Sequence, residues 1–297
     1  MDKLIQGIAA AGTVRFMAAI TTEITTEAFR RHQTSPTVSA ALGRVLTGTL
    51  LLGSSLKEFD RLTVKIECDG TVGGITAEAT LDGTVRGYVK NPEAESTPNA
   101  DGKLDVSGII GNGTFYVIRE SGYEIGLHRE PYVGSVPLIS GEIAEDFAYY
   151  LAKSEQIPSA VLLGVLAQNT EPFITASGGV MIQMLPDANE HIATMIEDTI
   201  GHAPHLTTLI KENASPRDLV KLALGEIDFE ILEEKEIRFA CNCSFERAVS
   251  LISSLGVAEV KSMLEEDKGA VMTCGFCNEI YRLDTVNLQR ILDLNSP

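Results

Sequence analysis

Two short cysteine motifs near the C-terminus decide how the last part of this sequence folds: 241-CNCS-244 and 274-CGFCN-278. They hold four of the five cysteines of the 297-residue chain, and 30 residues separate the two pairs. Four thiolates in two close pairs match the tetrahedral coordination that Zn²⁺ prefers, with Zn–S distances of ~2.3 Å. The pattern therefore predicts a zinc site made by Cys241, Cys243, Cys274 and Cys277.

The residues around the second motif predict a zinc knuckle between two strands. Gly275 is expected to let the backbone turn so that its amides face sulfur, with strands at 271–273 and 279–283. Helices are expected at 245–255, at 257–266 and after Asp284. A region of 57 residues is too small to hold together by core burial alone. Because structural zinc is worth ~10–16 kcal/mol of folding free energy, zinc loss should unfold this region.

The spacing leaves two interpretations of the metal open. Most closed four-thiolate sites are purely structural. However, cysteines two or three positions apart can form a disulfide locally, because their Cα atoms can lie ~4.4–6.8 Å apart. Each pair thus contains its own oxidation partner, which makes a redox switch the second interpretation.

Residues 1–186 predict an N-terminal domain of mixed helices and strands, so that the fold class is α+β. Leu62, Val64 and Ile66 alternate with polar residues, which is the period of a half-buried strand. Further strands are expected at 3–9, 14–21, 72–81, 113–120, 161–167 and 173–185, and helices at 22–33, 36–56 and 141–156. The fifth cysteine, Cys68, is expected to be a buried strand residue.

Residues 187–240, here called the linker segment, predict an acidic helical connection to a C-terminal domain at 241–297. The linker segment contains 12 acidic and 5 basic residues. Ser215 and Pro216 have the residue types of a helix N-terminus, and Gly225 those of its end. Its apolar stripes are narrow, so we expect it to dock only marginally.

The overall charge of −17 excludes several classes of partner. A chain this acidic has no general attraction for nucleic-acid phosphates or anionic membrane surfaces. The longest charge-free windows contain 15 residues, against the ~20 apolar residues of a membrane span. The N-terminus also lacks the pattern of a signal peptide. We therefore expect a cytoplasmic protein, with cysteines present as thiols or metal ligands.

Other functions share parts of the pattern. A static zinc ribbon that binds nucleic acid or protein is the main alternative, although 8 acids against 5 bases in 241–297 disfavour phosphate contacts. A dithiol oxidoreductase would normally place its C-x-x-C motif at the start of a helix. A metal hydrolase needs an open coordination position, which four thiolates do not leave. Nucleotide-binding and hydrolase motifs are missing from the sequence, and we expect a protein that is not an enzyme. His202 and His205 are weaker metal candidates.

The chain resembles the redox-regulated heat-shock chaperone family, the bacterial 33 kDa chaperonin, over its whole length. The two cysteine motifs are the most specific part of the resemblance. Two further stretches also match, 154-SEQIPS-159 and 178-GGVMIQ-183, the latter running to Leu185 and Pro186. Leu283 departs from the family pattern, in which an aromatic residue is expected after Tyr281.

The resemblance implies a chaperone that holds unfolding proteins without ATP. In the reduced state the four cysteines would bind Zn²⁺ and the chaperone would be inactive. Peroxide or hypochlorous acid, together with unfolding conditions, would form disulfides and release zinc. The C-terminal domain and the linker segment would then unfold, and the exposed apolar surface would bind unfolding client proteins. The family also associates as homodimers when active.

Two finer predictions follow. Because short loops close most readily, we expect Cys241 to pair with Cys243 and Cys274 with Cys277 on oxidation. We also expect the linker segment to couple zinc loss to client binding, because it joins the zinc domain to the N-terminal domain. Its candidate client contacts are Ile192, Met195, Ile196, Leu206, Leu209, Leu219 and Leu222.

Overall fold

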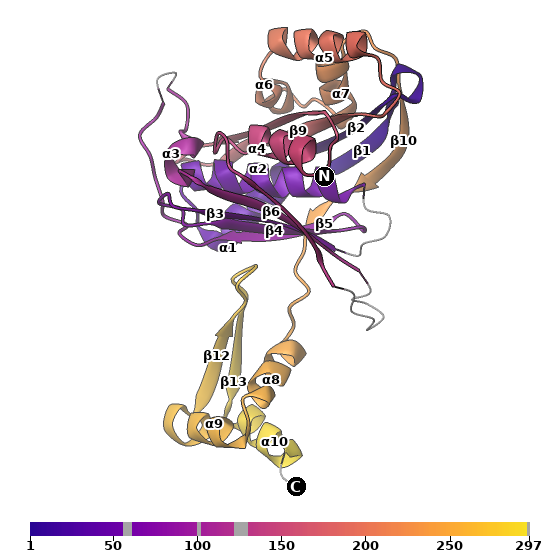
Figure 1. Ribbon diagram of the computed structural model, residues 1–297. Coiled ribbons are helices and arrows are strands. Elements are labelled where there is room, and N and C mark those ends of the chain that lie inside the picture. The colour runs from indigo at the N-terminus through magenta and orange to yellow at the C-terminus, as the bar shows by residue number, and fades with distance from the viewer. Residues whose placement is uncertain (56–60, 100–101, 122–129, 296–297) are drawn as a thin grey trace. The chain divides into compact units, whose positions relative to one another are not determined.

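The computed structural model describes residues 1–55, 61–99, 102–121 and 130–295 (Figure 1). The chain forms two compact units, Met1–Ala240 and Cys241–Pro297. The first unit contains two large sheets and the helices packed on them, and the second contains a hairpin and short helices. The α+β class predicted from the sequence is therefore confirmed.

One sheet of the first unit has the strand order β10-β1-β2-β9-β8, and all its neighbours are antiparallel. Its strands are β1 (Lys3–Ala9), β2 (Val14–Ile20), β8 (Ser159–Ala167), β9 (Ile174–Met184) and β10 (Phe229–Glu236). The other sheet has the order β11-β5-β4-β3-β6-β7, in which only the short β11 runs parallel to its neighbour. Its strands are β3 (Arg61–Cys68), β4 (Ile75–Thr80), β5 (Thr84–Val89), β6 (Gly113–Glu120), β7 (Tyr132–Pro137) and β11 (Arg238–Phe239).

Helix α2 (Pro36–Gly53) lies between the two sheets and forms the centre of the main core (Figure 1). It begins where Ser35 accepts a hydrogen bond from the amide of Val38, and Pro36 occupies the first turn. Gly48 allows the ring of Phe147 to approach, because a Cβ there would lie 2.5 Å from ring carbons. Residue 56, the expected end of this helix, lies outside the described residues.

Three further helices accompany this core: α1 (Thr22–His32), α3 (Val106–Ile110) and α4 (Ala144–Lys153). Cys68 ends β3 and is half-buried, which is less than the full burial expected from the sequence. His202 and His205 form no shared site. His202 Nδ1 lies 2.8 Å from the carbonyl oxygen of Asp198, whereas His205 Nε2 lies 3.2 Å from Lys103 Nζ.

The linker segment forms α5 (Glu190–His202), α6 (Leu206–Lys211) and α7 (Pro216–Leu224), which cover one face of the five-stranded sheet (Figure 1). The linker segment is docked in this structure, with Leu219 and Leu224 fully buried in a second core. The narrow apolar stripes suffice because the sheet supplies the opposing surface, including Phe16 and Val180. The capping box at Ser215 confirms the predicted start of α7.

The acidic end of the linker segment is a strand rather than part of a helix. β10 pairs antiparallel with β1, and its Phe229 and Ile231 pack against the second core. Its acidic residues lie on the edge of the sheet, where Glu234 forms a 2.6 Å ion pair with Lys3. In the sequence the period of two is short and is hidden by the surrounding acidic residues. The chain then passes to the other sheet as β11.

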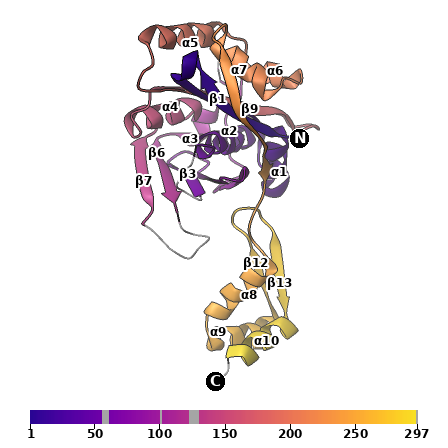
Figure 2. The ribbon, with the colours of Figure 1, turned by 90° about the vertical axis from the view of Figure 1, so that its right-hand side faces the viewer.

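The second unit consists of α8 (Phe245–Ser254), α9 (Val257–Ser262), the hairpin of β12 (Gly269–Thr273) and β13 (Ile280–Asp284), and α10 (Thr285–Asn295) (Figure 2). A π-helical turn, Met263–Asp267, connects α9 to the hairpin. The buried core of this unit is small and consists of Ala248, Ile252, Val260, Leu283, Leu288 and Ile291. Among the described residues, no helix is long and apolar enough to cross a membrane.

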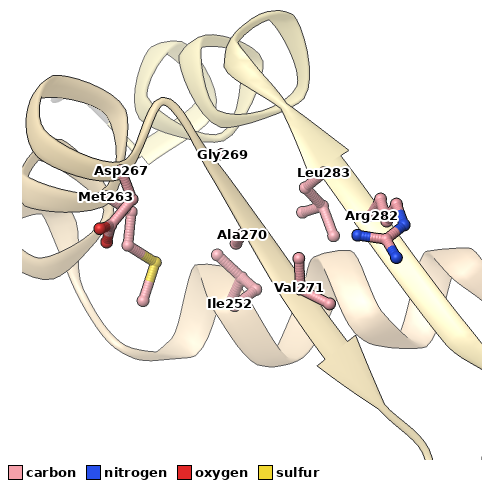
Figure 3. Close-up of a pocket in the computed structure, with 8 residues that line it drawn as sticks. All are labelled: Ile252, Met263, Asp267, Gly269, Ala270, Val271, Arg282 and Leu283. Atoms are coloured by element: carbon pink, nitrogen blue, oxygen red, sulfur yellow. The ribbon is translucent and has the colours of Figure 1, made fainter.

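A cavity of about 460 Å³ opens beside Leu283 in this small unit (Figure 3). Ile252 and Met263 line it together with Leu283 and residues of the hairpin. Leu283 is the position at which the family resemblance leads us to expect an aromatic side chain. The cavity therefore lies where the sequence carries a smaller residue than the pattern predicts.

Candidate metal centre

The structure brings the four cysteines of the two motifs together. Their sulfur atoms all lie within 4.8 Å of one another. Cys241 Sγ is 3.7 Å from Cys274 Sγ, and Cys243 Sγ is 3.4 Å from Cys277 Sγ. A tetrahedral zinc ion with Zn–S distances of ~2.3 Å would separate its sulfurs by about 3.8 Å. The donor set and its spacing therefore fit a zinc ion.

Local backbone structure positions both pairs. After Cys243, the hydroxyl of Ser244 caps α8 by accepting a hydrogen bond from the Arg247 amide at 3.2 Å. In the knuckle, the amide of Asn278 donates to the carbonyl of Cys274 at 2.8 Å. The left-handed residue of this turn is Asn278, with φ of 56°, whereas Gly275, the residue that the sequence analysis singled out for the turn, has no positive φ. Asparagine tolerates this conformation, so the turn does not depend on the glycine.

The surroundings of the sulfurs disfavour free thiolates. Burial is the main cause that raises the pKa of the Cys243 and Cys277 thiols. Neighbouring thiols add to the increase at Cys277, whereas at Cys243 the hydrogen bonds with Tyr281 and Cys277 oppose it. The backbone amide of Glu279 hydrogen-bonds to Cys277 and opposes this increase. Without a cation these groups stay protonated at neutral pH, whereas a bound metal ion favours their deprotonated form. The cluster is thus suited to exchange protons for a divalent cation.

Tyr281 contacts the cysteine cluster, although our sequence analysis mentioned it only as the residue that precedes an expected aromatic position. Its hydroxyl donates a hydrogen bond to Cys243 Sγ at 3.1 Å. This bond is the main cause of the raised pKa of Tyr281. The sequence shows only that Tyr281 follows Cys277 by four positions in an expected strand. That the side chain reaches the other cysteine motif could not be read from the spacing.

The predicted client contacts are mostly covered in this structure. Ile196, Leu206 and Leu219 are buried in the second core. Ile192, Leu209 and Leu222 are partly buried against the same core, while Met195 is 37% exposed. All of them except Met195 belong to the core between the linker segment and the five-stranded sheet. Those six side chains become fully accessible only if the linker segment leaves the sheet, whereas Met195 is already partly exposed.

Fold and site together define a protein with a large double-sheet unit and a small unit built around a four-cysteine metal centre. The four cysteine sulfurs would fill all the positions of a tetrahedral ion, so the arrangement matches the closed type of metal site.

Comparisons with known proteins show which proteins share this fold and these cysteines. The family model described as "Hsp33 protein" matches residues 2–284. The chain is 41% identical to the 33 kDa chaperonin of Desulforamulus reducens over 291 residues, which cover 98% of this chain and 97% of the relative. It is 43% identical to the 33 kDa chaperonin of Bacillus subtilis (strain 168) over 294 residues, with 99% of each chain covered. The crystal structure of the 33 kDa chaperonin of Thermotoga maritima has a TM-score of 0.89 at 35% identity, covering 98% of each chain.

The chain belongs to the Hsp33 family. It is a redox-regulated chaperone with a zinc-binding cysteine cluster, and its partners are client proteins. The family resemblance inferred from the cysteine motifs is confirmed. The prediction that the chain belongs to a family of chaperones rather than enzymes is also confirmed.

Proposed function

We propose that Cys241, Cys243, Cys274 and Cys277 together hold the zinc ion and that their oxidation activates the chaperone. The observation that supports this is the gathering of the four sulfurs within 4.8 Å of one another. Bound zinc supplies folding free energy to the small unit, which has little core of its own. The reduced, zinc-bound protein is the inactive form in this proposal.

Oxidation forms one disulfide within each pair, Cys241 with Cys243 and Cys274 with Cys277. For each pair, two thiols lose two electrons and two protons to one peroxide molecule, which yields a disulfide and two water molecules. Sulfurs in disulfides carry no negative charge, so zinc loses its ligands. The short loops favour these pairings, although sulfurs of different pairs also lie close together. Peptide mapping of the oxidised protein tests this, and a dominant Cys243–Cys274 linkage would contradict it.

We further propose that the chain works in three parts, 1–186, 187–240 and 241–297. The linker segment is the coupling part because it is continuous with the metal unit in sequence and covers a broad apolar surface. Its release would expose Ile192, Met195, Ile196, Leu206, Leu209, Leu219 and Leu222 to clients. A bias of ~5.5 kcal/mol moves a two-state element from almost fully docked to almost fully open. Zinc binding supplies more than this.

Two finer assignments belong to the same proposal. The active oxidised form is a homodimer, as the family resemblance implies, and size-exclusion chromatography before and after oxidation tests this. The protein works in the cytoplasm, since its zinc-bound form requires four reduced thiols and that compartment keeps thiols reduced.

The decisive experiment oxidises the purified full chain with peroxide and follows zinc release and suppression of client aggregation together. Both should begin only in the oxidised sample, and activity should follow zinc release. Aggregation suppression by the fully reduced, zinc-bound protein would contradict the switch and favour a static zinc module.

Two variants test the ligand assignment. Cys277→Ser should reduce zinc from near-unit stoichiometry, because three thiolates hold the ion less well. Cys68→Ser is the matched control, since Cys68 lies in β3 and outside the cluster. Full zinc content in Cys277→Ser, or loss of zinc in Cys68→Ser, would overturn the four-cysteine assignment.

A further inference from the structure

The hydroxyl of Tyr281 lies beside the cysteine cluster. We propose that its hydrogen bond holds the Cys243 thiolate in place and protects it from oxidants. The inference deepens the proposed function and rests on it, because it takes the four cysteines as the zinc ligands. It rests directly on the 3.1 Å hydrogen bond that the Tyr281 O–H donates to Cys243 Sγ. Tyr281 is thus a positioning residue, which acts on the metal through one of its ligands.

The hydrogen bond between Tyr281 and Cys243 joins two distant parts of the sequence. Tyr281 belongs to β13, opposite Met272 of β12, in the hairpin that carries Cys274 and Cys277. Cys243 belongs to the first motif, 38 residues earlier. The ring of Tyr281 packs against the core of the small unit, and this packing directs the hydroxyl. The Tyr281 side chain therefore connects the first cysteine pair to the β12–β13 hairpin, which carries the second pair.

The expected effect on chemistry follows from the charge of the acceptor. Hydrogen bonds to an ionised acceptor are stronger than those to a neutral one. A donor at Cys243 therefore stabilises the thiolate and lowers its electron density, and a less basic thiolate is a weaker nucleophile. Outer partners of metal ligands also orient them, and their loss typically costs ~10–100-fold in metal affinity.

The charge of the acceptor also explains how the hydrogen bond between Tyr281 and Cys243 would be lost on oxidation. A disulfide sulfur is neutral and accepts hydrogen bonds weakly, so oxidation of Cys243 removes the reason for the contact. The first cysteine pair then no longer has this hydrogen bond to the β12–β13 hairpin. Cys277 differs because its donor is the backbone amide of Glu279, which no side-chain substitution removes. The donor at Cys243 is a side chain, so its effect can be tested by mutation.

The test compares zinc-loaded, full-length Tyr281→Phe with the unmodified protein. Phenylalanine keeps the packed ring and removes only the hydroxyl. Competition with a chelator should show about 10-fold weaker zinc binding. Mass spectrometry of iodoacetamide-treated protein should show Cys243 alkylated several-fold faster, with a smaller change at Cys274. Peroxide should also release zinc faster from the variant.

Met272→Leu is the matched control, because it alters the cross-strand neighbour of Tyr281 but keeps the hydroxyl. It should leave zinc affinity and Cys243 reactivity unchanged. A second probe is 3-fluorotyrosine at position 281, a more acidic phenol that should slow the alkylation of Cys243. This probe retains the donor, so it remains informative if Tyr281→Phe folds poorly.

The inference is overturned if Tyr281→Phe equals the unmodified protein in zinc affinity and in Cys243 reactivity. Equal acceleration at Cys243 and Cys274 would also overturn it, because that pattern indicates general loosening. If the unmodified protein does not bind zinc through the four cysteines, the proposed function itself fails. The zinc content of the unmodified reduced protein distinguishes the two cases.

Discussion

The linker segment and the C-terminal unit are of similar length but are stabilised differently. The linker segment has narrow apolar stripes, yet it buries them against a whole face of the five-stranded sheet. The C-terminal unit has only its own small core and leaves apolar side chains such as Leu251, Val271 and Val286 exposed by 57%, 61% and 71%. An element that lies on a large sheet can be stabilised by that sheet, whereas a unit with a small core of its own needs a further source of stability such as a metal.

The largest expected effect is the removal of zinc from the reduced protein by a chelator. The C-terminal unit should unfold, because metal supplies ~10–16 kcal/mol in small zinc modules. Hydrogen exchange should show loss of protection in α8 and in the β12–β13 hairpin, while β1, β2 and β9 remain protected. Continued protection of the hairpin without zinc would show that its core is sufficient by itself.

A smaller but substantial effect is expected from Ile196→Asp in α5. Ile196 is buried in the second core, so an unpaired charge there should cost on the order of 3–5 kcal/mol of docking. The reduced, zinc-loaded variant should show partial suppression of client aggregation. Hydrogen exchange should show that α5–α7 open while the zinc unit stays protected.

Thr194→Asp is the matched control for that prediction, since it adds the same charge at an exposed position of α5. It should leave the reduced protein inactive. If Ile196→Asp opens α5–α7 without any gain in activity, the linker segment is a passive connector, and the surface under it is not the client-binding surface.

A third prediction concerns pH and the buried Asp2. Its carboxylate accepts hydrogen bonds from the Glu23 and Ile24 amides at the start of α1, and burial raises its pKa to about 6. The folded state therefore binds a proton more tightly than the unfolded state, whose pKa is near 4. Below pH 4 both states are protonated and there is no penalty. As the pH rises from about 4 to about 6, this group lowers the free energy of unfolding by on the order of 3 kcal/mol.

Asp2→Asn should remove that dependence. Urea unfolding at pH 4 and at pH 7 should show the variant gaining stability relative to the unmodified protein at the higher pH. The zinc unit responds in the opposite sense, because acid protonates thiolates and favours zinc release. A difference between the two proteins that does not change with pH would show that Asp2 does not titrate in this range.

The smallest expected effect is a gain from filling the cavity beside Leu283. Leu283→Phe should stabilise the zinc-loaded C-terminal unit by about 1 kcal/mol, because the added ring fills part of the 460 Å³ space. Slower exchange of hairpin amides would show the gain. Leu283→Ala is the opposite arm and should accelerate exchange. A loss of stability in Leu283→Phe would show that the cavity cannot accept the ring.

Features that depend on neighbouring residues were predictable from the sequence alone. The alternation at Leu62, Val64 and Ile66 correctly indicated β3, and Ser215 correctly indicated the start of α7. The cysteine spacing singled out the four residues whose sulfurs the structure brings together. Backbone periodicity, helix capping and the spacing within each cysteine pair involve only a few neighbouring residues. They can therefore be recognised in a single sequence.

Features that depend on distant partners were decided only by the tertiary structure. β10 is a strand because β1 offers it an edge, although its acidic composition suggests otherwise. α5–α7 bury their narrow apolar stripes because the sheet beneath them completes their core. Tyr281 matters because its hydroxyl reaches a cysteine from the other motif. In each case the stabilising partner lies far away in sequence, and no local pattern specifies which surfaces will meet.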